Sequence, residues 1–145
     1  MDVLADTNVI LRRLIPLIRS TVGLRDAITK FSKGTNRVCV TSQNLIELWA
    51  VCTRPLENNG LGLTPAQADR VVARVGRSVF RLPDSDDAYP QWRRLVVTHG
   101  VSGKKTHDAR LVAAMIVHGI THILTFNADD FARYAGINVL HPAML

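Results

Sequence analysis

The chain has 145 residues, of which 47% are hydrophobic and 21% are charged. This length is typical of one domain with a real core, so we expect a single domain over residues 1–145 and exclude a disordered chain. The longest apolar run, residues 111–117, is far shorter than the roughly 20 residues that a membrane span needs. Asp2 and Asp6 interrupt the N-terminal apolar stretch, and Cys39 and Cys52 form no paired motif. We therefore expect a cytoplasmic protein with reduced thiols and no membrane segment.

The charge of the chain is strongly positive. Eighteen Lys and Arg residues stand against twelve Asp and Glu residues, which gives a net charge of +6. Such an excess is compatible with a polyanionic partner, although many basic proteins have none. If four of the acidic residues gather in one site, eight remain against the eighteen basic residues, and the rest of the surface carries +10. A surface with this charge could bind the phosphates of a nucleic acid.

Short β-branched runs alternate with longer helical stretches along the whole chain. In chain order they predict a strand over residues 2–6, helices over 8–14 and 21–32, a strand over 37–41, a helix over 43–53, a helix that starts at Pro65, a strand over 79–82, helices over 86–98 and 108–118, a strand over 122–125, a short helix over 128–134 and a last strand over 138–141. Ser42 and Thr64 are the expected N-caps of two of these helices.

This alternation predicts an α/β protein with a parallel sheet of four to five strands covered by helices on both faces. Ligands of such sheets bind at the carboxyl ends of the strands. Acidic residues occupy the corresponding places in the sequence. Asp6 ends the first strand, Glu47 lies in the second turn of the helix after the next strand, and Asp108 opens a later helix. Asp129 and Asp130 follow the fourth strand.

Each of these carboxylates also has an ordinary structural interpretation. Asp6 and Asp108 are suited to capping a helix, Asp129 could belong to a turn, and Glu47 could lie on a polar stripe of its helix. Their convergence on one sheet edge favours a site, because crowded carboxylates repel one another and a hard cation relieves that repulsion. Mg²⁺ and Mn²⁺ prefer oxygen ligands, and either can generate hydroxide for attack on a phosphodiester.

Basic and aromatic residues supply candidate contacts to nucleic acid. Lys104 and Lys105 lie on a glycine-flanked loop next to Asp108 and are the expected phosphate contacts, unless the loop is simply solvated. Trp49, Tyr89 and Trp92 could stack on unpaired bases, although aromatic residues at helical spacing are more often core or interface.

Four segments resemble, in order, the conserved motifs of PIN-domain nucleases. They are LADTNVIL (residues 4–11), NLIE (44–47), HDARLVAA (107–114) and ILTFNADDF (123–131). The resemblance covers residues 2 to about 142, and the length is similar to that of VapC-type toxins. It implies a three-layer α/β/α sandwich and a Mg²⁺- or Mn²⁺-dependent endoribonuclease that leaves a 5′-phosphate. It also implies a small antitoxin partner, a homodimer and an RNA substrate.

Carried over residue by residue, the resemblance makes Asp6, Glu47 and Asp108 metal ligands. Asn8 would orient Asp6 or the attacking water, and Thr125 would support the site from behind. Where the family often has an aspartate, this chain has Asn127, so either Asn127 or Asp129 completes the catalytic set and the number of metals stays open. The alternative is a non-catalytic, nucleic-acid-binding module of the same fold.

Overall fold

The computed structural model describes residues 1–14 and 36–142. The helix expected over residues 21–32 lies outside them. The elements in chain order are β1 (Asp2–Ala5), α1 (Thr7–Val9), the π-helical turn η1 (Ile10–Leu14), β2 (Arg37–Val40), α4 (Ser42–Thr53), η2 (Leu56–Asn58), α5 (Pro65–Ser78), β3 (Phe80–Arg81), α6 (Ala88–His99), α7 (Lys105–Val117), β4 (His122–Leu124), η3 (Ala128–Asp130) and β5 (Asn138–Leu140).

The five strands form one parallel sheet in the order β3-β2-β1-β4-β5. Leu4 of β1 is in register with Cys39 of β2 on one side and with Ile123 of β4 on the other. The chain first adds strands on one side of β1 and then returns to add β4 and β5 on its other side. Ligands bind at such a reversal of strand order, beyond the carboxyl ends of the strands. In this sheet the reversal lies between β1 and β4.

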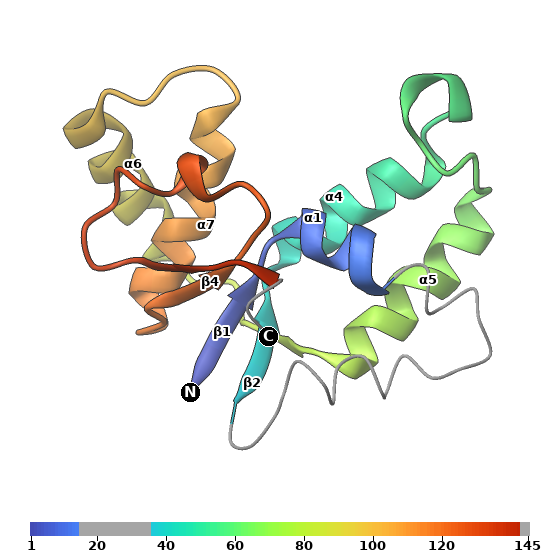
Figure 1. Cartoon of the computed structure of the whole chain (residues 1–145), viewed down its shortest axis with the longest axis horizontal. Helices are drawn as coiled ribbons and strands as arrows, with labels where there is room; N and C mark the ends of the chain where they lie inside the picture. Colours follow the sequence, from blue (N-terminus) through green and yellow to red (C-terminus); the bar gives the residue numbers. More distant parts are fainter. Residues whose placement is uncertain (15–35, 143–145) are drawn as a thin grey trace.

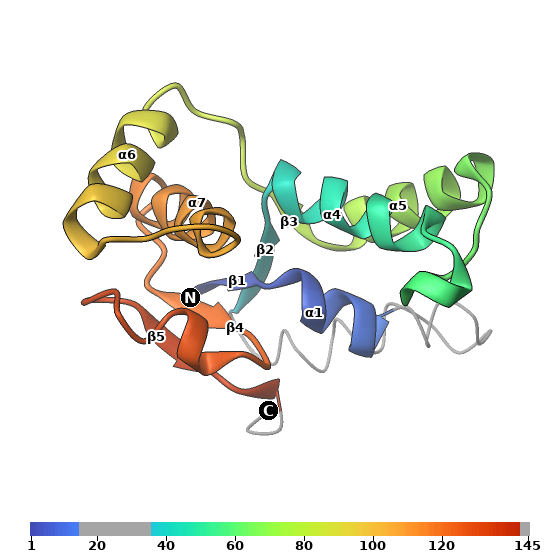
Figure 2. The same cartoon turned by 90° about the horizontal axis from the view of Figure 1, so that it is seen from above.

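Helices cover both faces of the sheet (Figures 1 and 2). Because side chains of a strand alternate between faces, Leu4 packs in one core with residues of α6 and α7, while Ala5 packs in a second core with residues of α4 and α5. Leu4, Met115 and Leu48 are completely buried in these two layers. The predicted α/β/α sandwich with a parallel sheet is confirmed, and it places α1, α4 and α7 around the carboxyl end of β1.

Two predicted helix starts were wrong by a few residues. Thr41, not Ser42, is the N-cap of α4, because its hydroxyl accepts a hydrogen bond from the Asn44 amide and the Thr41 amide donates one to the Asn44 side-chain oxygen. The helix α7 begins at Lys105, so Asp108 lies inside its first turn and does not open it. The expected N-cap at Thr64 is confirmed.

The helices of the described ranges are all too short or too polar to cross a membrane.

Candidate active site

Asp6 lies directly beyond β1 and is fixed by the hydroxyl of Thr125, at the end of β4. The Thr125 Oγ1 donates to Asp6 Oδ2 at 2.7 Å and accepts from the Asn127 amide at 3.0 Å. Asn8 Nδ2 donates to the same hydroxyl at 3.4 Å. Although Asp6 occupies the N-cap position of α1, its side chain forms no capping hydrogen bond. The Asp6 carboxylate is therefore fixed by the Thr125 hydroxyl and not by a capping hydrogen bond.

Glu47 is held from two sides. Its Oε2 accepts from Thr7 Oγ1 at 2.7 Å, and its Oε1 accepts from Gln43 Nε2 at 2.9 Å. Thr7 in turn accepts from Asn44 Nδ2 at 3.1 Å. Since Asn44 is completely buried and also closes the cap of α4, the start of this helix and the position of the Glu47 carboxylate depend on the same side chain.

Asp108 reaches the site from α7 and has the most perturbed acidity. Burial and, to a smaller extent, the negative charges of Asp130, Asp6 and Glu47 together raise its pKa to about 6, against the opposing effect of Lys105. Burial likewise raises the pKa of Asp6, against the opposing effect of its hydrogen bond from Thr125. Carboxyl groups lose their protons reluctantly where other carboxylates are near and water is scarce. The site therefore carries excess negative charge.

The turn after β4 contributes Asp130 to this charge. Asp130 raises the pKa of both Asp6 and Asp108, and its Oδ1 is in contact with Lys105 Nζ. Asp129, the residue predicted from the sequence, is exposed on η3 and is not among the charges that shift those pKa values. Its role as a ligand stays a prediction.

The remaining predicted residues lie around the cluster. Asn127 is exposed and meets Thr125 through its backbone amide. Lys104 is the exposed N-cap of α7, one residue before Lys105. Asn8 bridges two segments, because its Oδ1 also accepts from the Phe126 amide at 3.3 Å.

The donor chemistry of the cluster fits a hard divalent cation. The residues around Asp6 offer only oxygen ligands, and their mutual repulsion is the kind that a cation relieves. In residues 1–14 and 36–142, however, no three His, Cys, Asp or Glu side chains are close enough together to hold an ion as they stand. For three of these carboxylates to hold one ion, they would have to approach one another.

The residues that support the Glu47 carboxylate were not predicted from the sequence, unlike Asn8 and Thr125 beside Asp6. Thr7, Gln43 and Asn44 are buried polar side chains at the carboxyl edge of the sheet. Thr7 stands inside the DTN motif and Asn44 is the third residue after Thr41, so a capping box was a readable signal for Asn44. The contact of Thr7 with Glu47 joins residues forty positions apart and has no local signature.

The fold and this acidic edge define a class of protein. The family model of the PIN domain matches residues 3–137, and the chain belongs to that family. A sequence search among curated proteins finds no match.

Solved structures share the fold over nearly the whole chain. VapBC2 from Rickettsia felis, bound to a DNA fragment from its promoter, has a TM-score of 0.70 at 14% identity and covers 97% of this chain and 98% of its own. DNA-bound VapBC from Salmonella typhimurium has a TM-score of 0.67 at 19% identity, with coverage of 97% and 98%. VapC20 from Mycobacterium tuberculosis, described as a Sarcin-Ricin loop cleaving toxin, has a TM-score of 0.56 at 17% identity, with coverage of 94% and 98%.

Proposed function

We propose that the protein is a metal-dependent endoribonuclease and the toxin of a toxin–antitoxin pair. The observation that carries the proposal is the group of Asp6, Glu47, Asp108 and Asp130, whose charges act on one another at the carboxyl edge of a PIN-domain sheet. Such a group has little use in a stable core, because buried like charges are costly. It suits a site that recruits a cation and a phosphodiester.

In this proposal Asp6, Glu47 and Asp108 hold Mg²⁺ or Mn²⁺, and Asp130 completes the set in preference to Asp129. A bound ion of this kind supplies a nucleophilic hydroxide and stabilises the leaving oxygen. Thr125 keeps Asp6 in place, and the pair of donors on Glu47 keeps its carboxylate aimed at the same edge.

The proposed partners are those expected for a PIN-domain toxin. The neighbours of similar fold include VapBC toxin–antitoxin complexes. We therefore propose a small antitoxin as partner, RNA as substrate, the cytoplasm as location and a homodimer as the assembled toxin, with cleavage leaving a 5′-phosphate.

The direct test is cleavage of single-stranded RNA with Mg²⁺ or Mn²⁺ and with EDTA. We expect cleavage only with metal, and a loss of at least about a hundredfold in Asp6→Asn, because one ligand charge is removed with almost no change in volume. Asp69→Asn is the matched control: it removes the same charge from the exposed face of α5 and should cleave normally. Equal activity in Asp6→Asn and wild type would reject the assignment.

One observation favours a second function. In the described residues no three carboxylates are close enough together to share one ion, and a binding module without catalysis needs no such group. Such a module would bind RNA with the same affinity in EDTA and in Mg²⁺ and would cleave nothing in either.

A further inference from the structure

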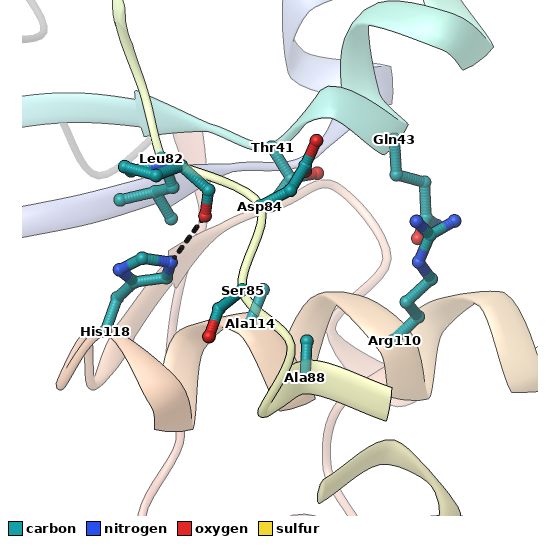
Figure 3. A pocket seen from close by; sticks show the side chains of 10 residues that line it. Thr41, Gln43, Leu82, Asp84, Ser85, Ala88, Arg110, Ala114 and His118 are labelled. Atoms are coloured by element: carbon teal, nitrogen blue, oxygen red, sulfur yellow. Dashed lines mark hydrogen bonds between the residues drawn. The ribbon is translucent and has the colours of Figure 1, made fainter. Parts of the chain in front are cut away.

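A cavity of about 90 Å³ lies beside the carboxylates, on the far side of Gln43. The start of α4, the segment after β3 and one side of α7 enclose it (Figure 3). Its polar lining includes Gln43, Asp84, Ser85 and Arg110. None of these four residues is part of the carboxylate cluster, although Gln43 contacts both regions.

The amide of Gln43 has only one orientation that suits its neighbours. Its Nε2 lies 2.9 Å from Glu47 Oε1 and 3.0 Å from the His107 carbonyl oxygen, and both of these atoms are acceptors. The amide oxygen must therefore point the other way. It is buried and has no hydrogen-bond partner among the residues that the structure describes. A buried acceptor without a donor is costly and is rare in native proteins.

Arg110 supplies hydrogen-bond donors to the same cavity, where Gln43 supplies an acceptor. It is exposed, and within the described ranges no hydrogen bond or ion pair is found for its guanidinium. Figure 3 shows its side chain and that of Gln43 pointing toward one another from α7 and α4. The other polar groups of the lining are engaged: Asp84 accepts from Ser42 at 3.1 Å, and His118 contacts the Pro83 carbonyl at 2.9 Å.

The cavity continues into a wider groove. Ser85, Ala88 and Arg110 line both, and the groove leads past His107 to Tyr89. The Tyr89 ring is 66% exposed and stacks on Trp92, with 5.8 Å between the ring centroids. An exposed, supported aromatic ring is a surface on which an unpaired base can stack.

We propose that this cavity recognises one unpaired RNA base next to the cleaved phosphodiester. Because Gln43 Oε1 is shielded in the unliganded protein, the base takes the place of the side-chain atoms that cover it. The base then donates an N–H to this oxygen and accepts from Arg110, while the adjoining base reaches Tyr89. A phosphate alone does not account for the cavity, because it has no donor for the Gln43 oxygen. The proposal rests on the nuclease function and adds a determinant of sequence specificity to it.

The test compares wild type, Arg110→Ala and Arg110→Lys on a pool of random single-stranded RNA, with the cleaved ends sequenced. We expect wild type to prefer one base at a fixed position beside the cut, and Arg110→Ala to reduce that preference about tenfold, the discrimination a good base-edge contact gives. Arg110→Lys should also lose it, because lysine lacks the planar fork of donors. Rescue by lysine would indicate a phosphate contact and would overturn base recognition.

Binding supplies a readout that does not need cleavage. Fluorescent oligonucleotides of A, C, G or U are titrated against Asp6→Asn and against the same protein with Arg110→Ala. We expect a preference for one base that Arg110→Ala removes and that Arg74→Ala, which deletes an equal charge from α5, retains. Absence of any preference, or its survival in Arg110→Ala, would reject the subsite. Failure of wild type to cleave RNA with any metal would reject the nuclease and leave the binding result to decide the subsite.

Discussion

Thr125 shows how a single hydroxyl organises the site. Its side chain is completely buried at the end of β4. The hydroxyl donates to Asp6 and accepts from the Asn127 amide and from Asn8. It therefore joins two segments that are distant in the sequence, residues 6–8 and 125–127, and no other hydroxyl in the described residues bonds to Asp6.

Thr125→Val should cost about 1–3 kcal/mol in the free energy of unfolding, because buried donors lose their acceptor. It should also lower the rate of RNA cleavage, because Asp6 is no longer fixed. Thr125→Ser keeps the hydroxyl and is the matched control. Urea unfolding and the cleavage assay measure the two effects, and normal cleavage in the valine variant would show that this hydroxyl does not position Asp6.

Asp108 makes stability depend on pH in the metal-free protein. Its pKa is about 6 in the folded protein against an ordinary value of 3.8. Between these values the folded state keeps a proton that the unfolded chain has lost, so the free energy of unfolding falls as the pH rises through this window. Above this pH window Asp108 is ionised, and the folded protein disfavours the ionised carboxylate.

In EDTA we therefore expect Asp108→Asn to have a higher Tm than wild type at about pH 7, and the difference to shrink toward about pH 4. Thermal unfolding followed by circular dichroism measures it. A difference that stays the same over this range would mean that Asp108 is not destabilised by its neighbours.

At the scale of elements, the start of α4 is tied to the site. The capping box of Thr41 and Asn44 begins the helix, and Asn44 also reaches Thr7, which holds Glu47. The helix α5 has a capping box of the same kind at Thr64, but its Thr64 and Gln67 are exposed. The residues that the structure describes thus contain two capping boxes of the same kind, of which only the one at Thr41 is connected to the carboxylates.

Thr41→Ala and Thr64→Ala should each cost about 1 kcal/mol of stability, the usual effect of losing such a cap. Only Thr41→Ala should also reduce cleavage, because it loosens Asn44 and through it Glu47. Stability by urea unfolding and activity on RNA separate the two. Equal activities in the two variants would show that the cap of α4 is purely structural.

The protein as a whole is positively charged, but one edge of its sheet is acidic. The net charge is +6 although four carboxylates, those of Asp6, Glu47, Asp108 and Asp130, lie at one edge of the sheet. Lys105 is in contact with Asp130 at this edge, whereas Lys104 next to it is exposed. Basic side chains so near the carboxylates suit a polyanion that must come close to them.

Replacing Lys104 and Lys105 by alanine should weaken RNA binding and flatten its dependence on salt, since each lost phosphate contact lowers the slope of log K against log salt by roughly 0.7 for a single strand. The Asp6→Asn protein is the background, so that RNA stays intact during titration. A salt slope equal to that of the parent protein would exclude these lysines as phosphate contacts.

The sequence was sufficient for the architecture and for a set of candidate carboxylates, but not for their surroundings. Alternating strands and helices fix a parallel sheet, and the ends of parallel strands share one edge, so Asp6 and Glu47 could be expected together. The sequence does not predict which carboxylate of the turn after β4 acts on them. Asp129 and Asp130 are adjacent, and only the backbone of η3 decides which one turns inward. The cavity beside Gln43 arises from three separate segments and has no pattern in the sequence.

The proposed nuclease function requires that Asp6, Glu47 and Asp108 together hold one hard cation. Titration of Mn²⁺ into the purified protein, followed by calorimetry and by the electron paramagnetic resonance of free Mn²⁺, tests it without any substrate. We expect saturable Mn²⁺ binding that Mg²⁺ displaces. The Mn²⁺ affinity should weaken below about pH 6, because Asp108 then takes up its proton. Asp6→Asn should lower the affinity at least about tenfold, whereas Asp69→Asn should leave it unchanged. Binding that is absent, or equal in wild type and Asp6→Asn, would contradict it.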